Sequence, residues 1–257
     1  MQQELLYDYP QYYEIAFSFR HIEAEAAFLN TCIQRYSQID VKRVLEIACG
    51  PAPHAGDLVE RGFTYIGLDI NPAMLKYAAS KWQDTRRPIE LVEADMVSFQ
   101  LESQVDFAFV MLGSLYLNSL SDMTRHFDSI ARVLRPGGLY FLDWCIQFND
   151  PMVPRIRSSF EAEIDGVTVD SRFDTRLVDP AKQLYEEVWT VEVDDHGRHR
   201  QFQMVERNRA VFPQEFLLFL QSRADFEFVG WWHDWDLRKP IDEASEITRP
   251  VVLIRRK

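Results

Sequence analysis

The 257-residue sequence lacks several features that mark common classes of protein. Its three cysteines, Cys32, Cys49 and Cys145, form no CxxC pair and have no zinc-ligand spacing, so nothing supports a disulfide framework or a metal cluster. Basic residues are also scarce, because 28 Lys and Arg stand against 40 Asp and Glu, for a formal net charge of -12. Neutralisation of phosphates supplies most nucleic-acid affinity, so we expect no nucleic-acid partner. The acidic balance is also compatible with an ordinary role in solubility.

Long apolar runs and a leader peptide are absent as well. No segment approaches the roughly 18 consecutive apolar residues of a membrane span. The first residues, MQQELLYDYPQYYEI, lack the basic start and the apolar stretch of a signal peptide. We therefore expect a cytoplasmic protein with no membrane partner, whose cysteines remain reduced thiols.

The apolar patterns of the first 150 residues predict a parallel sheet. Short apolar runs typical of buried strands occur at 43–48, 64–69, 89–95, 105–112 and 139–144. Helix signals lie between or before them, at 22–33, from near Pro53 to Gly62, after the Asn71-Pro72 cap, and from Ser121 to the RPGG sequence. Parallel neighbours need crossover connections. The expected fold class is α/β, with a Rossmann-like, seven-stranded, mostly parallel sheet and helices on both faces.

The pattern changes after Pro151. Long alternating runs follow, separated by Asp-Gly, Asp-Pro and His-Gly turns, which is typical of an antiparallel meander. Helical patterning returns at 213–223, and FEFVGWW and PVVLIRR read as two closing strands. We expect residues 1–150 and 213–257 to form one domain. Residues 151–212 would be an inserted β subdomain that covers a pocket or forms a homodimer surface, and the sequence does not choose between these.

Glycine is scarce in the loop after the first expected strand, VLEIACGPAPHAG at 44–56. A pyrophosphate needs several glycines there because backbone amides must approach it closely. Only Gly50 remains, and Ala48 and Ala52 stand where further glycines would be. NADH-dependent oxidoreduction is therefore disfavoured.

Carboxylates mark the same edge of the sheet instead. Glu46 lies in the first expected strand, Asp69 ends the second, 19 residues after Gly50, and Asp95 ends the third. Any one of these acids is more often a solvated cap, but three in register favour a ligand. The set suits a cationic, ribosylated ligand without phosphate, such as S-adenosylmethionine, with Asp69 accepting hydrogen bonds from the ribose hydroxyls.

Together these motifs resemble class I S-adenosylmethionine-dependent methyltransferases. The resemblance rests on LEIACGPAP, GLDINPAMLKYA, EADMVSF, DFAFVMLGSLYLNS and LRPGGLYFLDW, covers roughly residues 7–144, and resumes in the terminal strands. Pro51-Ala52-Pro53 departs from the family's usual glycine-containing turn. The resemblance implies S-adenosylmethionine as cofactor, with Glu46 and the 48–50 backbone on its methionine part, Asp69 on its ribose, and Asp95 at the adenine edge.

The amino-terminal sequences YDYPQYY and FSFRHIEAEAAFL are similar to those of sugar-amine and glycine N-methyltransferases. This resemblance implies a lid of Tyr7, Tyr12, Tyr13 and Arg20, with the planar guanidinium of Arg20 on the methionine carboxylate. Alternatively, the tyrosines are core residues and Arg20 lies on a helix surface. The expected cofactor contacts are Tyr12, Arg20, Glu46, Ala48, Cys49, Gly50, Asp69, Ile70, Met74, Asp95, Met96 and Met111.

The implied activity is methyl transfer to a small-molecule acceptor, with an amine favoured and an oxygen acceptor as the alternative. Alignment supplies much of the rate of such an in-line displacement. Tyr116 and His54 are the catalytic candidates, and no metal is expected. Asp143, His233 and Asp234 are further candidate bases, and Trp144 would form a wall of the site. Trp231, Trp232 and Trp235 would form a packing cluster or a substrate cage. A non-enzymatic cofactor-binding module is the competing hypothesis, suggested by the Pro51-Ala52-Pro53 departure.

Overall fold

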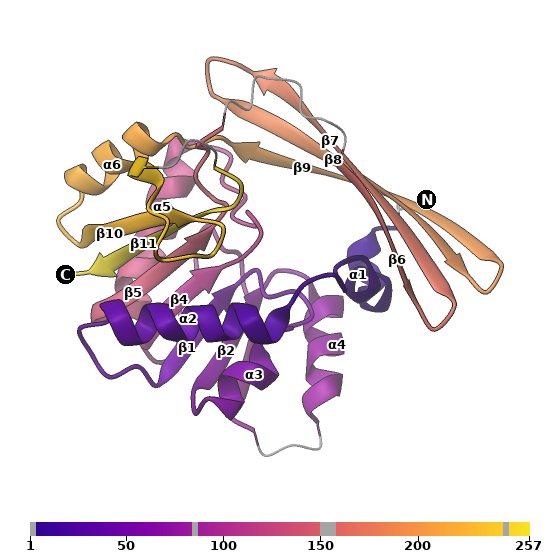
Figure 1. The fold of residues 1–257 in the computed structure, drawn as a ribbon, viewed down its shortest axis with the longest axis horizontal. Coiled ribbons are helices and arrows are strands. Elements are labelled where there is room, and N and C mark those ends of the chain that lie inside the picture. The colour runs from indigo at the N-terminus through magenta and orange to yellow at the C-terminus, as the bar shows by residue number, and fades with distance from the viewer. Residues whose placement is uncertain (1–3, 84–86, 150–157, 244–246) are drawn as a thin grey trace.

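The computed structural model describes residues 4–83, 87–149, 158–243 and 247–257. Their strands form two β-sheets (Figure 1). Sheet A has the strand order β10-β11-β5-β4-β1-β2-β3. Its strands are β1 (Arg43–Ile47), β2 (Thr64–Asp69), β3 (Ile89–Glu93), β4 (Val105–Val110), β5 (Leu134–Asp143), β10 (Phe226–His233) and β11 (Pro250–Arg256). β1 to β5 are mutually parallel, and β11 runs antiparallel to both of its neighbours. The predicted fold class is confirmed.

The α-helices after residue 20 begin and end close to the predicted signals, whereas no helix was predicted before it. The helices are α1 (Pro10–Ala16), α2 (Ile22–Tyr36), α3 (Ala55–Glu60), α4 (Pro72–Trp82), α5 (Leu120–Val133) and α6 (Pro213–Ser222), with 3-10 turns η1 (Leu6–Asp8) and η2 (Ile241–Glu243). Asn71 caps α4 as predicted, because its Oδ1 accepts hydrogen bonds from the amides of Ala73 and Met74. Helix α5 begins at Leu120, one residue before the predicted start at Ser121, because the hydroxyl of Ser119 accepts from the amide of Asp122 and caps the helix.

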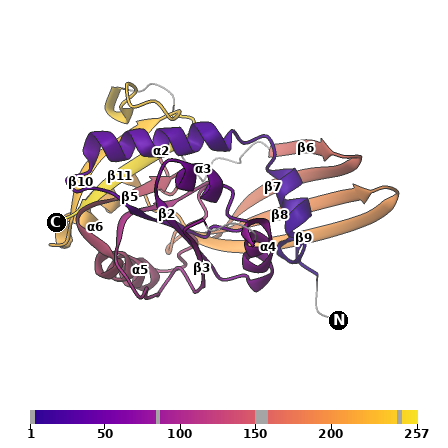
Figure 2. The same cartoon turned by 90° about the horizontal axis from the view of Figure 1, so that it is seen from below.

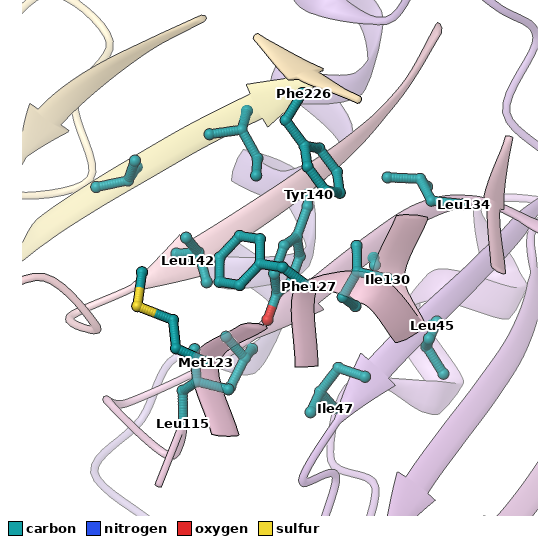
Figure 3. Close-up of a cluster of buried hydrophobic side chains, with 14 of the residues drawn as sticks. Leu45, Ile47, Leu115, Met123, Phe127, Ile130, Leu134, Tyr140, Leu142 and Phe226 are labelled. Carbon is teal, nitrogen blue, oxygen red and sulfur yellow. The ribbon is translucent and has the colours of Figure 1, made fainter. Parts of the chain in front are cut away.

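Period-2 alternation in the strands divides the core of sheet A into two layers. Leu45 and Ile47 of β1 face α5 and α6, and Figure 3 shows them near Phe127, Ile130 and Tyr140. Val44 faces the opposite layer, which α2 and α3 cover. Glu46 alternates with Leu45 and Ile47, so it also faces α2. The acidic side chain of Glu46 therefore lies on the side of the sheet that α2 and α3 cover, and not on the side of α5 and α6.

Sheet B is an antiparallel meander, as the turn signals predict. Its strands are β6 (Ser158–Ile164), β7 (Val167–Asp179), β8 (Leu184–Asp195) and β9 (Arg198–Arg209). Asp165-Gly166 and His196-Gly197 both have positive φ and make the two-residue hairpin turns. The predicted insertion starts at Pro151, which lies outside the described residues, and the division into two domains stays a prediction.

The amino-terminal segment lies between the two sheets (Figures 1 and 2). The inner face of sheet B packs on η1 and α1, where Leu6, Tyr12 and Ala16 meet buried Trp189 and Phe202. The same segment contacts α4 of the main layer. Tyr7 and Tyr13 of this segment are thus held near the carboxyl ends of the sheet A strands. No helix within the described ranges has the length and apolar character needed to cross a membrane.

Candidate functional site

The loop after β1 turns without the usual glycines. Ala48, Gly50 and Ala52 have φ values of 53°, 53° and 52°, and for the two alanines a left-handed conformation costs roughly 1–2 kcal/mol each. Two bonds to β2 hold the loop: the amide of Cys49 donates to the Leu68 carbonyl at 3.0 Å, and the amide of Gly50 donates to Asp69 at 2.7 Å. The carboxylate of Asp69 therefore holds the loop in place, and the two hydrogen bonds offset the cost of the left-handed alanines.

Asp69 sits half-buried at the end of β2, at the rim of sheet A. Its Oδ2 accepts from Gly50, and its Oδ1 accepts from the amide of Asn71 at 2.8 Å. Burial raises the pKa of Asp69, the backbone amides of Asn71, Gly50 and Ile70 oppose this, and the charge of Glu46 adds to the rise. Each carboxylate oxygen has two acceptor sites, so Asp69 can still accept hydrogen bonds from hydroxyl groups.

Glu46 belongs to a buried polar network on the α2 side of the sheet. Its side chain is 3% exposed. One carboxylate oxygen lies 2.7 Å from His54 Nδ1, and the other accepts from the Tyr65 hydroxyl at 2.5 Å. Both oxygens are thus engaged within the protein.

The network continues from His54 to the amino-terminal segment. His54 Nε2 lies 3.0 Å from Glu25 Oε2 of α2, and the His54 ring is fully buried. Arg20 donates to Glu25 through Nε at 3.4 Å and Nη2 at 2.5 Å. Glu25 therefore holds the arginine that the resemblance assigns to a carboxylate of the cofactor.

A second ion pair joins the network from the β5 side. Arg249 donates to both oxygens of Asp143, at 3.0 and 2.6 Å, and reaches Glu25 at 3.5 Å. Asp143 also accepts from the amide of Leu112 and from the indole of Trp235. With its carboxylate so engaged and fully buried, Asp143 fastens the end of β5 to the loop after β4.

Electrostatics shift the pKa values of His54 and Glu25 in this network. Burial alone would lower the pKa of His54, but the charge of Glu46 and the bonds to both glutamates outweigh it, so the pKa is raised. Burial would raise the pKa of Glu25, yet the bonds from His54 and Arg20 lower it to about 2. Glu25 therefore carries its charge at neutral pH, and the surroundings of His54 favour its protonated form.

Two tyrosines lie over the rim, and a third does not. The Tyr13 ring would be 4.0 Å from a Cβ atom on Gly50, and burial raises its pKa to about 12, with Asp69 and Glu46 also raising it. Tyr7 packs on Tyr13 at 6.1 Å between ring centroids. Tyr12 instead donates to Asp195 of sheet B at 2.8 Å and packs on Phe202. The structure does not bring Tyr12 to the rim.

Sheet B contributes carboxylates beside the same tyrosines. Glu206 and Glu187 are cross-strand neighbours on the inner face of β9 and β8. Burial raises the pKa of Glu206, Tyr7 donates a hydrogen bond that opposes the rise, and the charge of Glu187 adds to it. Burial also raises the pKa of Tyr116 well above its usual range, with further contributions from both glutamates. Tyr7, Tyr116 and Glu206 therefore share one polar environment between the two sheets.

The other predicted residues fall into different surroundings. Ile70 is 63% exposed beside Asp69, whereas Met74 and Met111 are buried. Asp95 is exposed and accepts from the amide of Val97 at 2.8 Å. The carbonyl of Met96 accepts from Nδ1 of buried His126 at 2.7 Å. Ile70 and Asp95 are thus the accessible members of this set.

The remaining candidates lie toward β10. Asp234 is exposed and pairs with Lys239, and the buried Nδ1 of His233 has no hydrogen-bond partner among the described residues. Trp232 and Trp235 belong to the α2-side core, and Trp231 packs against the other layer. The three tryptophans are thus packing residues on opposite sides of sheet A. Sequence reasoning missed Glu25, Arg249 and Glu206, whose partners lie far away in the chain.

Comparison with known proteins finds a family model that matches part of the chain. Residues 44–138 match the family model described as a methyltransferase domain. The match covers this part of the chain, and together with the strand order of sheet A it bears out the resemblance to methyltransferases that the motifs indicate.

Individual relatives extend the comparison. A protein called putative methyltransferase YqeM from Bacillus subtilis (strain 168) is 33% identical over 103 residues, 39% of this chain and 41% of its own. Glycine N-methyltransferase from Rattus norvegicus is 30% identical over 115 residues, 39% of each chain. The chain thus spans about two fifths of the length of these relatives.

A solved structure resembles nearly the whole chain. CalS10, described as an amino pentose methyltransferase from Micromonospora echinaspora with S-adenosylmethionine bound, has a TM-score of 0.74 and 19% identity, and the match covers 95% of this chain and 96% of that one. At this identity, the likeness extends to the fold alone.

Proposed function

We propose that the protein is an S-adenosylmethionine-dependent methyltransferase that acts on a small molecule carrying an amine. The observation that carries this proposal is the carboxylate of Asp69, held at the end of β2 by the amides of Gly50 and Asn71. A loop whose amide is already given to a carboxylate is poorly suited to a phosphate. It suits a cationic donor with ribose hydroxyls.

The residues at the rim fit this cofactor. Asp69 retains acceptor sites for the ribose, exposed Ile70 offers an apolar surface for the adenine, and Asp95 lies at the next strand end. Arg20 is a cation within the rim network, suited to the methionine carboxylate. When bound, the cofactor supplies an electrophilic methyl group on a sulfonium.

Tyr7 and Tyr13 are the proposed lid. They pack on each other and on Trp189 of sheet B, so their aromatic surface excludes water from the rim. Tyr12 lies on the sheet B side of the same helix, and we give it the role of fastening this lid.

Glu206 favours an amine as the acceptor. Its carboxylate lies in the shared environment of Tyr7 and Tyr116 and has a raised pKa. Such a group attracts a protonated amine and takes up its proton more readily than an ordinary glutamate. We therefore assign proton acceptance to Glu206 and orientation of the acceptor to Tyr116.

The two faces of sheet B differ, and this difference suggests a role for the sheet. Its inner face carries the lid contacts and Glu206, while its outer face has Glu186 between Arg176 and Arg207. We propose that residues 151–212 form an inserted subdomain that caps the acceptor site. A homodimer across the polar outer face is the alternative use.

Calorimetric titration with S-adenosylhomocysteine, followed by incubation with labelled S-adenosylmethionine and matched panels of small amines and alcohols, tests the proposal. We expect binding and preferential labelling of amines. Absence of binding would refute the cofactor assignment. Binding without transfer to any acceptor would favour a cofactor-binding module, and preferential labelling of alcohols would refute the amine assignment.

A further inference from the structure

The buried ring of His54 lies between two carboxylates. Nδ1 is 2.7 Å from Glu46 Oε1, and Nε2 is 3.0 Å from Glu25 Oε2. Ionised carboxylate oxygens only accept hydrogen bonds, so each ring nitrogen must carry a proton to bond its neighbour. Nη2 of Arg20, which can only donate, also lies 3.3 Å from Nε2, but the Glu25 oxygen is the nearer neighbour, so the geometry favours an imidazolium.

The charges around His54 balance only in that state. Glu25, Glu46 and Asp143 supply three negative charges, and Arg20 and Arg249 supply two positive ones. The other groups that face the ring are the uncharged Tyr65, which donates to Glu46, and the Phe109 ring. A protonated His54 makes the network neutral, whereas a neutral His54 would leave one buried charge uncompensated.

Arg20 depends on this network for its orientation. Its Nε and Nη2 donate to Glu25, and Glu25 is itself held by His54 and Arg249. The Arg20 side chain is 8% exposed, and its Nη1 makes no hydrogen bond within the described ranges, so a ligand bonded to this atom would displace no partner. Arg20 is thus anchored by one edge and presents the other.

We propose that His54 is a positioning residue: a buried imidazolium that fixes Glu25 and thereby aims Arg20 at the carboxylate of the bound cofactor. This inference rests on the proposed function, because it takes the cofactor's amino-acid part as the ligand of Arg20. It also gives His54 a role other than that of catalytic base, because both ring nitrogens are engaged and the ring is closed to solvent.

His126 provides an internal contrast. It is equally buried, but its Nδ1 donates to the Met96 carbonyl, and its Nε2 lies 2.9 Å from the Tyr140 hydroxyl, which can donate to it. Burial lowers the pKa of His126 to about 4, whereas the carboxylates raise that of His54. The pKa values of two histidines with the same exposure are thus shifted in opposite directions.

The test compares two ligands that differ in the amino-acid part. S-adenosylhomocysteine carries the carboxylate, and 5′-methylthioadenosine lacks it. For His54→Gln, we expect the Kd of the first to rise by about tenfold to a hundredfold, the loss for one hydrogen bond to a charged group, and that of the second to stay within about twofold. The matched variant His126→Gln should leave the ratio of the two Kd values unchanged. Equal weakening of both ligands by His54→Gln, or no weakening of either, would overturn the inference.

Nitrogen-15 NMR of the wild-type imidazoles tests the charge state without a variant. At pH 7.5, both ring nitrogens of His54 should carry protons, and only one of those of His126. A neutral His54 would overturn the inference whatever ligand binds. If the wild type binds neither ligand, the proposed function fails and the positioning role in cofactor binding fails with it, whereas normal binding with a neutral His54 defeats the inference alone.

Discussion

Replacing Asp69 with Asn separates the two roles of this carboxylate. Asp69 accepts one amide on each oxygen, from Gly50 at 2.7 Å and from Asn71 at 2.8 Å. An asparagine keeps one oxygen and turns an NH₂ group toward the other amide. It therefore loses one hydrogen bond to a charged group, worth about 1.5–3 kcal/mol of unfolding free energy. A ribose hydroxyl that bonds to the Asp69 carboxylate would lose a similar amount of binding free energy in the variant. The Kd of S-adenosylhomocysteine should therefore rise about 10- to 150-fold.

Glu93→Gln is the matched control, because Glu93 pairs with Asp69 in the parallel register of β2 and β3 but is exposed. It should change the unfolding free energy by less than about 0.5 kcal/mol and leave the Kd unaltered. The assays are urea unfolding and calorimetry on the folded variants. A destabilised Asp69→Asn protein that binds the ligand as tightly as the wild type would refute the ribose assignment and leave Asp69 as a loop cap.

Three further predictions concern the acceptor side, the core and the close approach of the loop to β2. Glu206→Gln should raise KM for amines more at low pH than at high pH, because the carboxylate attracts the protonated form; an unchanged pH profile of KM would argue against this role. Burial lowers the pKa of His126 from 6.5 to about 4, so the stabilising contribution of the neutral ring is fully present above pH 6.5. About 3 kcal/mol of unfolding free energy is lost as the pH falls from 6.5 to 4. In urea unfolding across this range, His126→Gln should lack this part of the decline, and an identical decline in the variant would contradict the prediction. Gly67→Ala should cost about 1–3 kcal/mol in urea unfolding, because its Cβ would lie 2.8 Å from the Cys49 sulfur, and unchanged stability would show that the loop shifts freely.

Local signals predicted most of sheet A. The apolar runs that became β1, β2 and β4 are short and bounded by turns, and the Asn71-Pro72 pair marks the start of α4 through a bond between neighbours in the chain. Asp69 was predicted at the rim for the same reason. A residue that ends a buried parallel strand lies at the carboxyl edge of the sheet whatever its partners are.

The partners of these residues depend on distant segments, which no local pattern contains. Glu25 reads as an ordinary charge on an amphipathic helix, yet it is held by Arg249 from the opposite end of the chain. Glu206 alternates with exposed residues on β9, so the strand pattern gives it no special role. Its hydrogen bond from Tyr7 comes from the distant amino-terminal segment. Tyr12 and Tyr13 are neighbours on the short helix α1, so their side chains point in different directions. Tyr13 faces the rim, and Tyr12 faces sheet B.

A crystal structure of the protein grown with S-adenosylhomocysteine tests the central claim most directly. We predict that the ribose hydroxyls lie within hydrogen-bond distance of Asp69 and the amino-acid carboxylate within reach of Arg20. Density for the ligand elsewhere, or at the rim with its ribose turned away from Asp69, would contradict the account.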